Sequence, residues 1–362
     1  MSKKTKDLTR REFVKQAGLG AAAIAVASAA PLNLSQAATI KNGMGYRTLG
    51  RTGLEISEVA LGGGSLSETE SNLVRMAVSK GINFLETSSN YRRSQAETTI
   101  GKTVKSMGIR DKVIILTKTG NLAMSRMLNA STSEVEKAIR DELEGSLQRL
   151  ETDYIDVFIC PYSATSPEEA ASPALQEALE KFKKEGKIRF TGVSTHTDYA
   201  NVCMAAIEEG YHDTIVLPIN FATVHPQIRD IVMGSRTSSA GASEKGRKQG
   251  GKQGGKQGGK RGGKRGGGRQ RAILDVRDVL KAAQKKNIGV IAIKGGHEGF
   301  LPPSVHDQIK SAVAASDTKL SFHQLAYRYV LDQPQVSAVT IRMTSMLHLD
   351  EALVLSQKTL KG

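Results

Sequence analysis

The stretch NFLETSSNYRRSQAETTIG, residues 83–101, begins like a buried strand and then changes character. Its opening Phe84-Leu85 is apolar enough to run through a core, but Glu86 ends the apolar run and Tyr91 follows five residues later. A carboxylate in that place either caps an ordinary strand or forms half of a proton-transfer site. The organisation of the rest of the chain decides between these two interpretations.

Apolar runs of strand length alternate with helical patterns after residue 45. The predicted strands are 58–61, 83–87, 112–117, 154–160, 188–193, 214–219, 289–293 and 338–341. The clearest predicted helices are 70–79, 133–150, 168–184, 272–286, 322–331 and 348–355. Ser133 followed by Glu136 predicts a capping box for the second of these helices. Eight β-α units without a break in composition predict a (β/α)8 TIM barrel.

A doubly wound sheet is the alternative fold. It calls for a glycine-rich phosphate turn after the first strand, and Gly62-Gly63-Gly64 follows that strand without the G-x-G-x-x-G spacing. In a barrel, the active site lies where strands end and loops begin. Glu86, Tyr91 and Lys118 all follow or close predicted strands, so we expect the three to face the same rim.

The charge of the chain lies in two appendages. The 362 residues carry a formal net charge of +15, yet residues 1–37 hold six Lys/Arg against two Asp/Glu, and residues 236–271 hold twelve against one. The remainder is balanced, which argues against a basic nucleic-acid-binding face on the domain. The two cysteines, Cys160 and Cys203, form no disulfide framework or Cys/His metal spacing, and we predict no metal site.

The N-terminus carries the features of an export signal. Arg10-Arg11 stands in a basic head, a short apolar run covers residues 17–30, and Ser35-Gln36-Ala37 makes a small-residue cleavage site. This segment, residues 1–37, resembles a twin-arginine signal. The resemblance implies the twin-arginine export machinery as a partner and a periplasmic or extracellular location, with no membrane span in the mature chain. The alternative is a lipid-facing or disordered N-terminus.

A low-complexity insert covers residues 236–271. Its core is a tandem of Lys-Gln-Gly-Gly that drifts into Lys-Arg-Gly-Gly, without apolar residues to bury, and it is predicted to be disordered. One interpretation is a repeat expansion that a loop tolerates. The other is attachment of residues 241–269 to an acidic polymer, nucleic acid or membrane surface. In a barrel, this strand-to-helix loop leaves from the catalytic rim.

Residues 45–357 resemble the aldo-keto reductase family. Four passages carry the likeness: YRTLGRTGLEISEVALGGG, GINFLETSSNYRRSQAETTIG, RDKVIILTKTG and LEGSLQRLETDYIDVFI. They match, in order, the N-terminal hairpin with the first strand, the strand that precedes the catalytic tyrosine, the lysine strand, and the helix with the fourth strand. The resemblance implies a TIM barrel with an N-terminal β-hairpin.

The resemblance also implies a reaction. In that family a hydride passes between NAD(P)(H) and a carbonyl/alcohol substrate, while a tyrosine exchanges a proton with the oxygen. By position Tyr91 is the acid/base, Lys118 is the lysine that lowers the pKa of the tyrosine, and Glu86 is the carboxylate that orients the lysine. Glu86 would then hold Lys118 in position for catalysis.

The chain departs from the family at several positions. Glu86 replaces an aspartate, and Pro161 replaces a histidine, so that Tyr91 alone, Tyr162 or a loop residue must polarise the carbonyl. Among the cofactor positions, the resemblance implies Ser194, Thr195, Lys294 and Arg342 as contacts of NADP or NAD. Pro218, Ile293 and Ala352 replace residues that bind the cofactor elsewhere in the family. These losses leave an alternative open: a catalytically degenerate barrel that acts as a binding protein outside the cytoplasm.

Overall fold

The computed structural model describes residues 39–224, 276–296, 307, 310–311 and 320–356. The predicted export segment, 1–37, and the cationic insert, 236–271, lie outside the described residues. Within the described ranges, no helix is long and apolar enough to cross a membrane.

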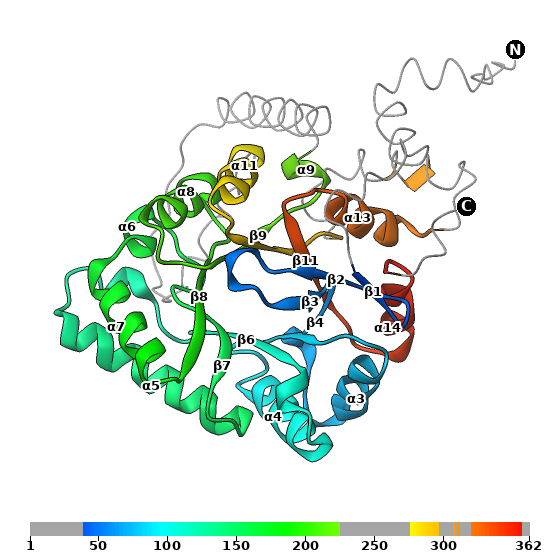
Figure 1. Cartoon of the computed structure of the whole chain (residues 1–362), viewed down its shortest axis with the longest axis horizontal. Coiled ribbons are helices and arrows are strands. Elements are labelled where there is room, and N and C mark those ends of the chain that lie inside the picture. The colour runs from blue at the N-terminus through cyan, green and yellow to red at the C-terminus, as the bar shows by residue number, and fades with distance from the viewer. Residues whose placement is uncertain (1–38, 225–275, 297–306, 308–309, 312–319, 357–362) are drawn as a thin grey trace, which may run out of the picture.

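Eight parallel strands close into a barrel (Figure 1). They are β4 (Val59–Gly62), β5 (Phe84–Glu86), β6 (Ile114–Lys118), β7 (Ile155–Ile159), β8 (Ile188–Ser194), β9 (Thr214–Pro218), β10 (Gly289–Ile293) and β11 (Val336–Arg342). Pairing of β11 with β4 closes the ring. The predicted (β/α)8 barrel is confirmed, and each predicted strand overlaps an observed one with ends shifted by at most two residues.

Helices surround the barrel on its outer side (Figure 1). They are α3 (Ser71–Ser79), α4 (Gln95–Met107), α5 (Thr132–Leu150), α6 (Pro167–Ala170), α7 (Pro173–Lys184), α8 (Tyr199–Glu209), α9 (Phe221–Val224), α11 (Arg277–Lys285), α13 (Phe322–Leu331) and α14 (Met346–Leu353). Each described loop between a strand and the following helix therefore lies at the carboxyl end of the strands.

Two predicted helix features are wrong, and the helix predicted over 348–355 begins and ends two residues earlier, as α14. The capping box of α5 uses Ser131 and Glu134 rather than Ser133 and Glu136: Glu134 N donates to Ser131 Oγ at 3.3 Å, and Ser131 N donates to Glu134 Oε2 at 2.8 Å. The sequence offers two overlapping Ser-x-x-Glu pairs, and the earlier one gives the longer helix. The single helix predicted over 168–184 is divided into α6 and α7, because Pro173 cannot continue a helix.

Alternation along the strands sorts the apolar side chains into two clusters. Phe84 and Leu116 belong to a cluster formed by every second residue of the strands, which fills the barrel interior. Leu85 and Ile115, the neighbours of these residues in sequence, belong to the larger cluster between strands and helices. Glu86 follows Phe84 by two positions, and Lys118 follows Leu116 by two. Both therefore point inward, at the carboxyl end of their strands.

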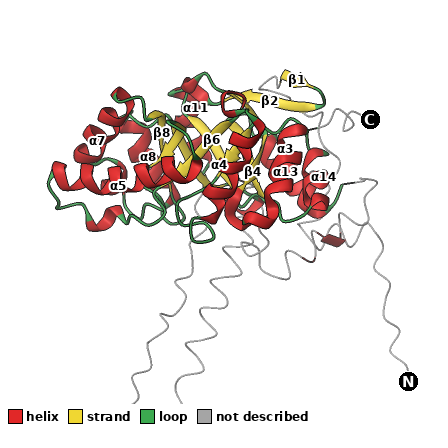
Figure 2. Cartoon of the chain, turned by 90° about the horizontal axis from the view of Figure 1, so that it is seen from below, coloured by secondary structure: helices red, strands yellow, loops and turns green. Residues whose placement is uncertain are grey.

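A small antiparallel sheet closes the opposite end of the barrel (Figure 2). It consists of β1 (Thr39–Lys41), β2 (Met44–Thr48) and β3 (Glu55–Ser57), so the predicted N-terminal hairpin is present and begins six residues before position 45. Leu49, Leu54 and Ile56 enter the interior cluster and fill the barrel floor. The carboxyl ends of the strands form the other, open end.

The floor is fitted closely to the strands. Gly50 has a φ of +49°, and a Cβ atom at this position would lie 2.3 Å from the backbone nitrogen of Gly289 on β10. A side chain there would separate the floor from the barrel, so only glycine permits the contact.

Candidate active site at the carboxyl ends of the strands

Glu86 and Lys118 form a buried ion pair inside the mouth of the barrel. Both follow the inward positions of Phe84 and Leu116, and their side chains are 3% and 2% exposed. Lys118 Nζ contacts Glu86 Oε1 directly and donates a second hydrogen bond to the carbonyl of Thr87 at 2.7 Å. The glutamate that replaces the family's aspartate therefore reaches the lysine.

Tyr91 completes the cluster. Its hydroxyl donates to Glu86 Oε1 at 3.3 Å, and Lys118 Nζ lies 5.0 Å from the centre of its ring. The three residues predicted from sequence as catalytic thus lie in contact, at the end of the barrel where active sites of this fold are found.

The pKa of Tyr91 is raised overall rather than lowered as expected. Burial raises the pKa of the Tyr91 hydroxyl above its usual value, and the nearby Tyr162 phenol adds to this shift. Burial also lowers the pKa of Lys118, while the Glu86 carboxylate in contact with its ammonium works against that change. Because Glu86 accepts from both groups, Tyr91 rests as a protonated phenol rather than as a phenolate.

A hydrogen-bonded platform fixes the loop that carries Tyr91. Ser89 Oγ donates to Glu142 Oε2 at 2.6 Å and accepts from the backbone of Gly120 at 2.8 Å. Asn90 Nδ2 donates to the carbonyl of Gly120 at 2.9 Å. A Cβ atom at Gly120 would lie 2.4 Å from Asn90 Cγ, so this position requires glycine. Sequence reasoning missed Gly120, although it stands two residues after Lys118.

Tyr162 and His196 extend the cluster past Pro161. The Tyr162 ring packs edge-on against the His196 ring with centroids 6.1 Å apart, and Tyr162 lies near enough to Tyr91 to affect its pKa. His196 Nδ1 lies 3.3 Å from Lys294 Nζ. Because lysine only donates, Nδ1 accepts, and a neutral ring carries its proton on Nε2. Sequence reasoning named Tyr162 but missed His196, whose signal was its place two residues after Ser194.

The two predicted cofactor residues on β8 differ in what they can offer. Ser194 Oγ accepts from the backbone of Ser163 at 3.1 Å, and no described residue accepts the Ser194 proton. Thr195 donates to the carbonyl of Ala164 at 2.8 Å and also contacts the carbonyl of Thr197. The hydroxyl of Thr195 is therefore engaged within its own loop, whereas Ser194 retains a proton for a ligand.

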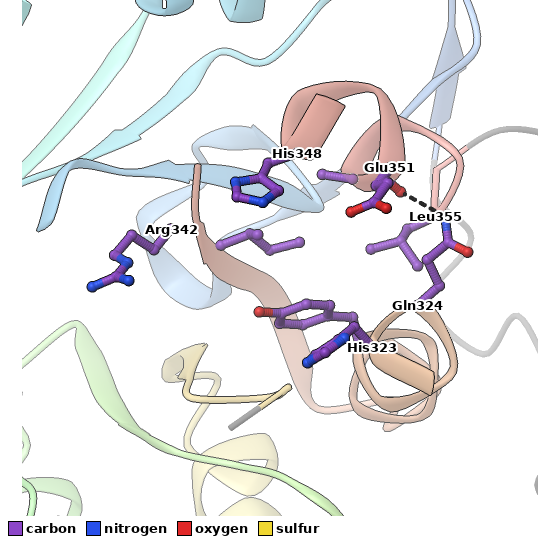
Figure 3. Close-up of a pocket in the computed structure, with 9 residues that line it drawn as sticks. His323, Gln324, Arg342, His348, Glu351 and Leu355 are labelled. Carbon is purple, nitrogen blue, oxygen red and sulfur yellow. Dashed lines mark hydrogen bonds between the residues drawn. The ribbon is translucent and has the colours of Figure 1, made fainter. Parts of the chain in front are cut away.

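Arg342 lies at the edge of a cleft between β11, α13 and α14 (Figure 3). The cleft is lined by His323, Gln324, Tyr327, Ile341, Arg342, His348, Glu351, Ala352 and Leu355. Gln324 Nε2 donates to the carbonyl of Glu351 at 3.1 Å. Cationic, aromatic and aliphatic groups share one concave wall, as binding sites for small molecules require.

Gly64 connects the cleft to the cluster of Glu86, Tyr91 and Lys118. A Cβ atom at Gly64 would lie 4.0 Å from Tyr91 Cε2 and 3.9 Å from Arg342 Cδ. Arg342, Gly62 and Glu86 also share one register row across β11, β4 and β5. The structure therefore brings Arg342 beside Tyr91, while Lys294 is bonded to His196 on another side of the mouth.

A parallel barrel with a carboxylate, an ammonium and a phenol at its carboxyl-terminal mouth defines a class of enzyme fold, and comparison with known proteins identifies the family. Residues 50–232 match the model of the aldo/keto reductase family. The chain belongs to the aldo/keto reductase family.

Individual relatives support this assignment over different lengths. The chain is 35% identical to aldo-keto reductase YhdN of Bacillus subtilis over 163 residues, which cover 42% of this chain and 47% of the relative, about half its length. It is 26% identical to L-galactose dehydrogenase of Arabidopsis thaliana over 318 residues, which cover 84% of this chain and 86% of that relative. The structure of aldo-keto reductase AKR11C1 from Bacillus halodurans superposes with a TM-score of 0.60 at 21% identity, covering 86% of this chain and 90% of that one, and shows the same fold.

Proposed function

We propose that this protein is an NAD(P)-dependent oxidoreductase that interconverts a carbonyl compound and an alcohol, with Tyr91 as acid/base. The observation that carries the proposal is the contact of Tyr91 and Lys118 with the same carboxylate, Glu86, inside the barrel mouth.

The residues around the mouth fit a nicotinamide dinucleotide. Arg342 would hold a phosphate, the apolar wall of Ile341, Ala352 and Leu355 suits an adenine ring, and the free proton of Ser194 suits the nicotinamide amide. When bound, the reduced nicotinamide supplies a hydride. Because Arg342 has no carboxylate partner among the described residues, its charge favours NADP(H), which carries the additional phosphate.

Tyr91 supplies the proton of the reduction. The phenol O–H bond breaks as the O–H bond of the product alcohol forms, and the hydride reaches the carbonyl carbon. Because the pKa of Tyr91 is raised, the phenol stays protonated at neutral pH. Its oxygen needs stabilisation only when negative charge develops on it during proton transfer. The Lys118 ammonium, 5.0 Å from the ring centre, lowers the energy of that developing charge. In the oxidation direction, the phenolate accepts the proton of the alcohol.

Tyr162 is proposed to take the place of the missing histidine. Pro161 offers no proton, but the phenol of Tyr162, which packs edge-on against His196, is a donor at the mouth. It can hold the carbonyl oxygen against Tyr91. Since a relative that matches most of the chain is named for L-galactose, a sugar is the first neutral substrate to test.

Export stays a prediction that rests on Arg10-Arg11 and the segment that follows it. We propose passage through the twin-arginine machinery, with retention in the cytoplasm when both arginines are replaced by lysine. We also propose that residues 241–269 attach to an acidic polymer. Deletion of these residues without loss of heparin retention would remove that role.

Nucleotide binding tests the oxidoreductase proposal. Titration of the purified protein with NADPH and NADH, followed by nucleotide fluorescence, is expected to show saturable binding that is tighter for NADPH. Arg342→Gln is expected to weaken NADPH about tenfold and NADH little, because only NADPH carries the additional phosphate. Arg75→Gln, which changes a surface arginine bonded to Ser106, serves as the control. If neither nucleotide binds, the proposal fails and the binding-protein alternative takes its place.

A further inference from the structure

Four arginines of the described residues have side chains with neither a hydrogen bond nor an ion pair, and all four lie at the carboxyl end of the strands. They are Arg92 and Arg93 after β5, Arg126 after β6, and Arg342 at the end of β11. The other described arginines are all engaged: Arg47, Arg51, Arg75, Arg110, Arg140, Arg149, Arg189, Arg277 and Arg328. Among the described residues, the open end of the barrel therefore collects the guanidinium groups that no other described side chain neutralises.

Arg92 and Arg93 occupy a backbone conformation that arginine does not favour. Their φ angles are +51° and +56°, and Ser94 follows at +71°. Left-handed residues without glycine cost about 1–2 kcal/mol each, and Gly or Asn is the usual choice. Strained residues of this kind gather at binding and catalytic sites.

The turn is held in place by its own hydrogen bonds. Ser94 Oγ donates to the carbonyl of Ser89 at 2.6 Å, and Arg93 N donates to the carbonyl of Asn90 at 3.3 Å. Consecutive Cα atoms are about 3.8 Å apart, so the Cα atom of Arg93 lies within about 7.6 Å of that of Tyr91. The backbone that carries both arginines is thus fixed next to the proposed proton donor.

Acidic groups at this end of the barrel have partners in or near their own loops. Glu86 is paired with Lys118. The carboxylates of the surrounding loops bind local donors: Glu68 with Lys102, Glu70 with Ser67, Glu169 with Thr165, and Asp198 with Asn201. Glu70, Glu169 and Asp198 have neutral donors as these partners and keep their charge. The charges that directly follow Tyr91 in its own loop, Arg92 and Arg93, are positive, and arginine stays charged at every working pH.

We propose that Arg92 and Arg93 bind an oxyanion group of the substrate, so that the preferred substrate is a carbonyl compound that carries a carboxylate or phosphate. This inference rests on the proposed function of Tyr91. Two neighbouring guanidinium groups present forked donors that match the oxygens of such groups. Arg342, which lines the cleft between β11, α13 and α14, is left to the cofactor.

Each substrate pair in the test compares an anionic aldehyde with a neutral analogue. 4-Carboxybenzaldehyde is compared with its neutral ester, methyl 4-formylbenzoate, and D-glyceraldehyde 3-phosphate with D-glyceraldehyde, by kcat/KM and by calorimetric binding in the presence of NADP⁺. The wild-type protein is expected to prefer at least one anion about tenfold or more, and added salt reduces the preference. The substrate pair with the larger preference for its anion shows whether the site binds a carboxylate or a phosphate.

Arg92→Gln/Arg93→Gln is expected to remove the preference by lowering kcat/KM for the anion about tenfold, with the neutral partner and NADPH affinity unchanged. Arg126→Gln, the control, keeps the preference. Equal use of both members of each pair by the wild-type protein overturns the inference, as does a double variant that loses NADPH affinity but keeps the preference. If no aldehyde is reduced while anion binding still depends on Arg92 and Arg93, the anion site stands and the hydride-transfer proposal fails.

Discussion

Replacement of Tyr91 by phenylalanine is expected to lower kcat for carbonyl reduction by about 10²–10⁴-fold, the contribution of a positioned general acid. The fold should persist, because the Tyr91 hydroxyl makes a single hydrogen bond, to Glu86 at 3.3 Å, and its ring remains. Nucleotide affinity should also persist. Steady-state reduction of an aldehyde by NADPH, with thermal unfolding measured in parallel, separates these effects.

The pH profile gives the same prediction a second readout. Burial raises the pKa of Tyr91, so the wild-type protein should not lose its proton donor before the pH passes the usual phenol value of about 10. Tyr46→Phe is the matched control, since Tyr46 donates to the carbonyl of Gly81 at 2.6 Å at the closed end of the barrel. A Tyr91→Phe variant that keeps its rate within threefold removes the phenol from the mechanism.

Replacement of Lys118 by methionine is expected to cost about 3–5 kcal/mol of folding free energy, because it leaves the carboxylate of Glu86 buried without its counter-ion. The paired side chains are only 2% and 3% exposed, so water cannot take the place of the ammonium. Urea unfolding near neutral pH measures the loss. Since a protonated Glu86 needs no counter-ion, the loss should shrink as the pH falls.

A second change separates pairing from packing. Glu86→Gln/Lys118→Met removes the stranded charge and should recover most of the lost stability, while activity stays low. Lys137→Met breaks a pair with Asp141 at 2.7 Å whose side chains are 76% and 66% exposed, and it should change stability by less than about 1 kcal/mol. A Lys118→Met variant as stable as the Lys137→Met control would show that Glu86 and Lys118 are not a buried pair.

Much of the cluster of Glu86, Tyr91 and Lys118 could be predicted from the sequence, because it depends on local order. Strand alternation carries the inward direction from Phe84 to Glu86, and parallel strands bring their carboxyl ends together whatever the loops contain. The helix break at Pro173 was equally local, and its signal was present in the sequence. These features need only the spacing of residues along the chain.

The remaining features depend on contacts between distant segments. The direction of the Tyr91 pKa shift follows from burial and from Tyr162, which approaches from β7. The contact of His196 with Lys294 joins loops after β8 and β10, and the need for glycine at position 120 comes from Asn90. Sequence spacing carries no information on such distances, so residue types in these loops could suggest candidates but not their contacts.

Transfer of deuterium tests the central claim most directly. The protein is incubated with 4-carboxybenzaldehyde or its methyl ester and with NADPH deuterated at C4 of the nicotinamide, on each face in turn, and the alcohol is analysed by mass spectrometry. We expect one face to deliver a single deuterium to the carbinol carbon, rapidly with wild-type protein and at least about a hundredfold more slowly with Tyr91→Phe. Alcohol formed at equal rates by both proteins, or no labelled alcohol from any bound aldehyde, would contradict hydride transfer assisted by Tyr91.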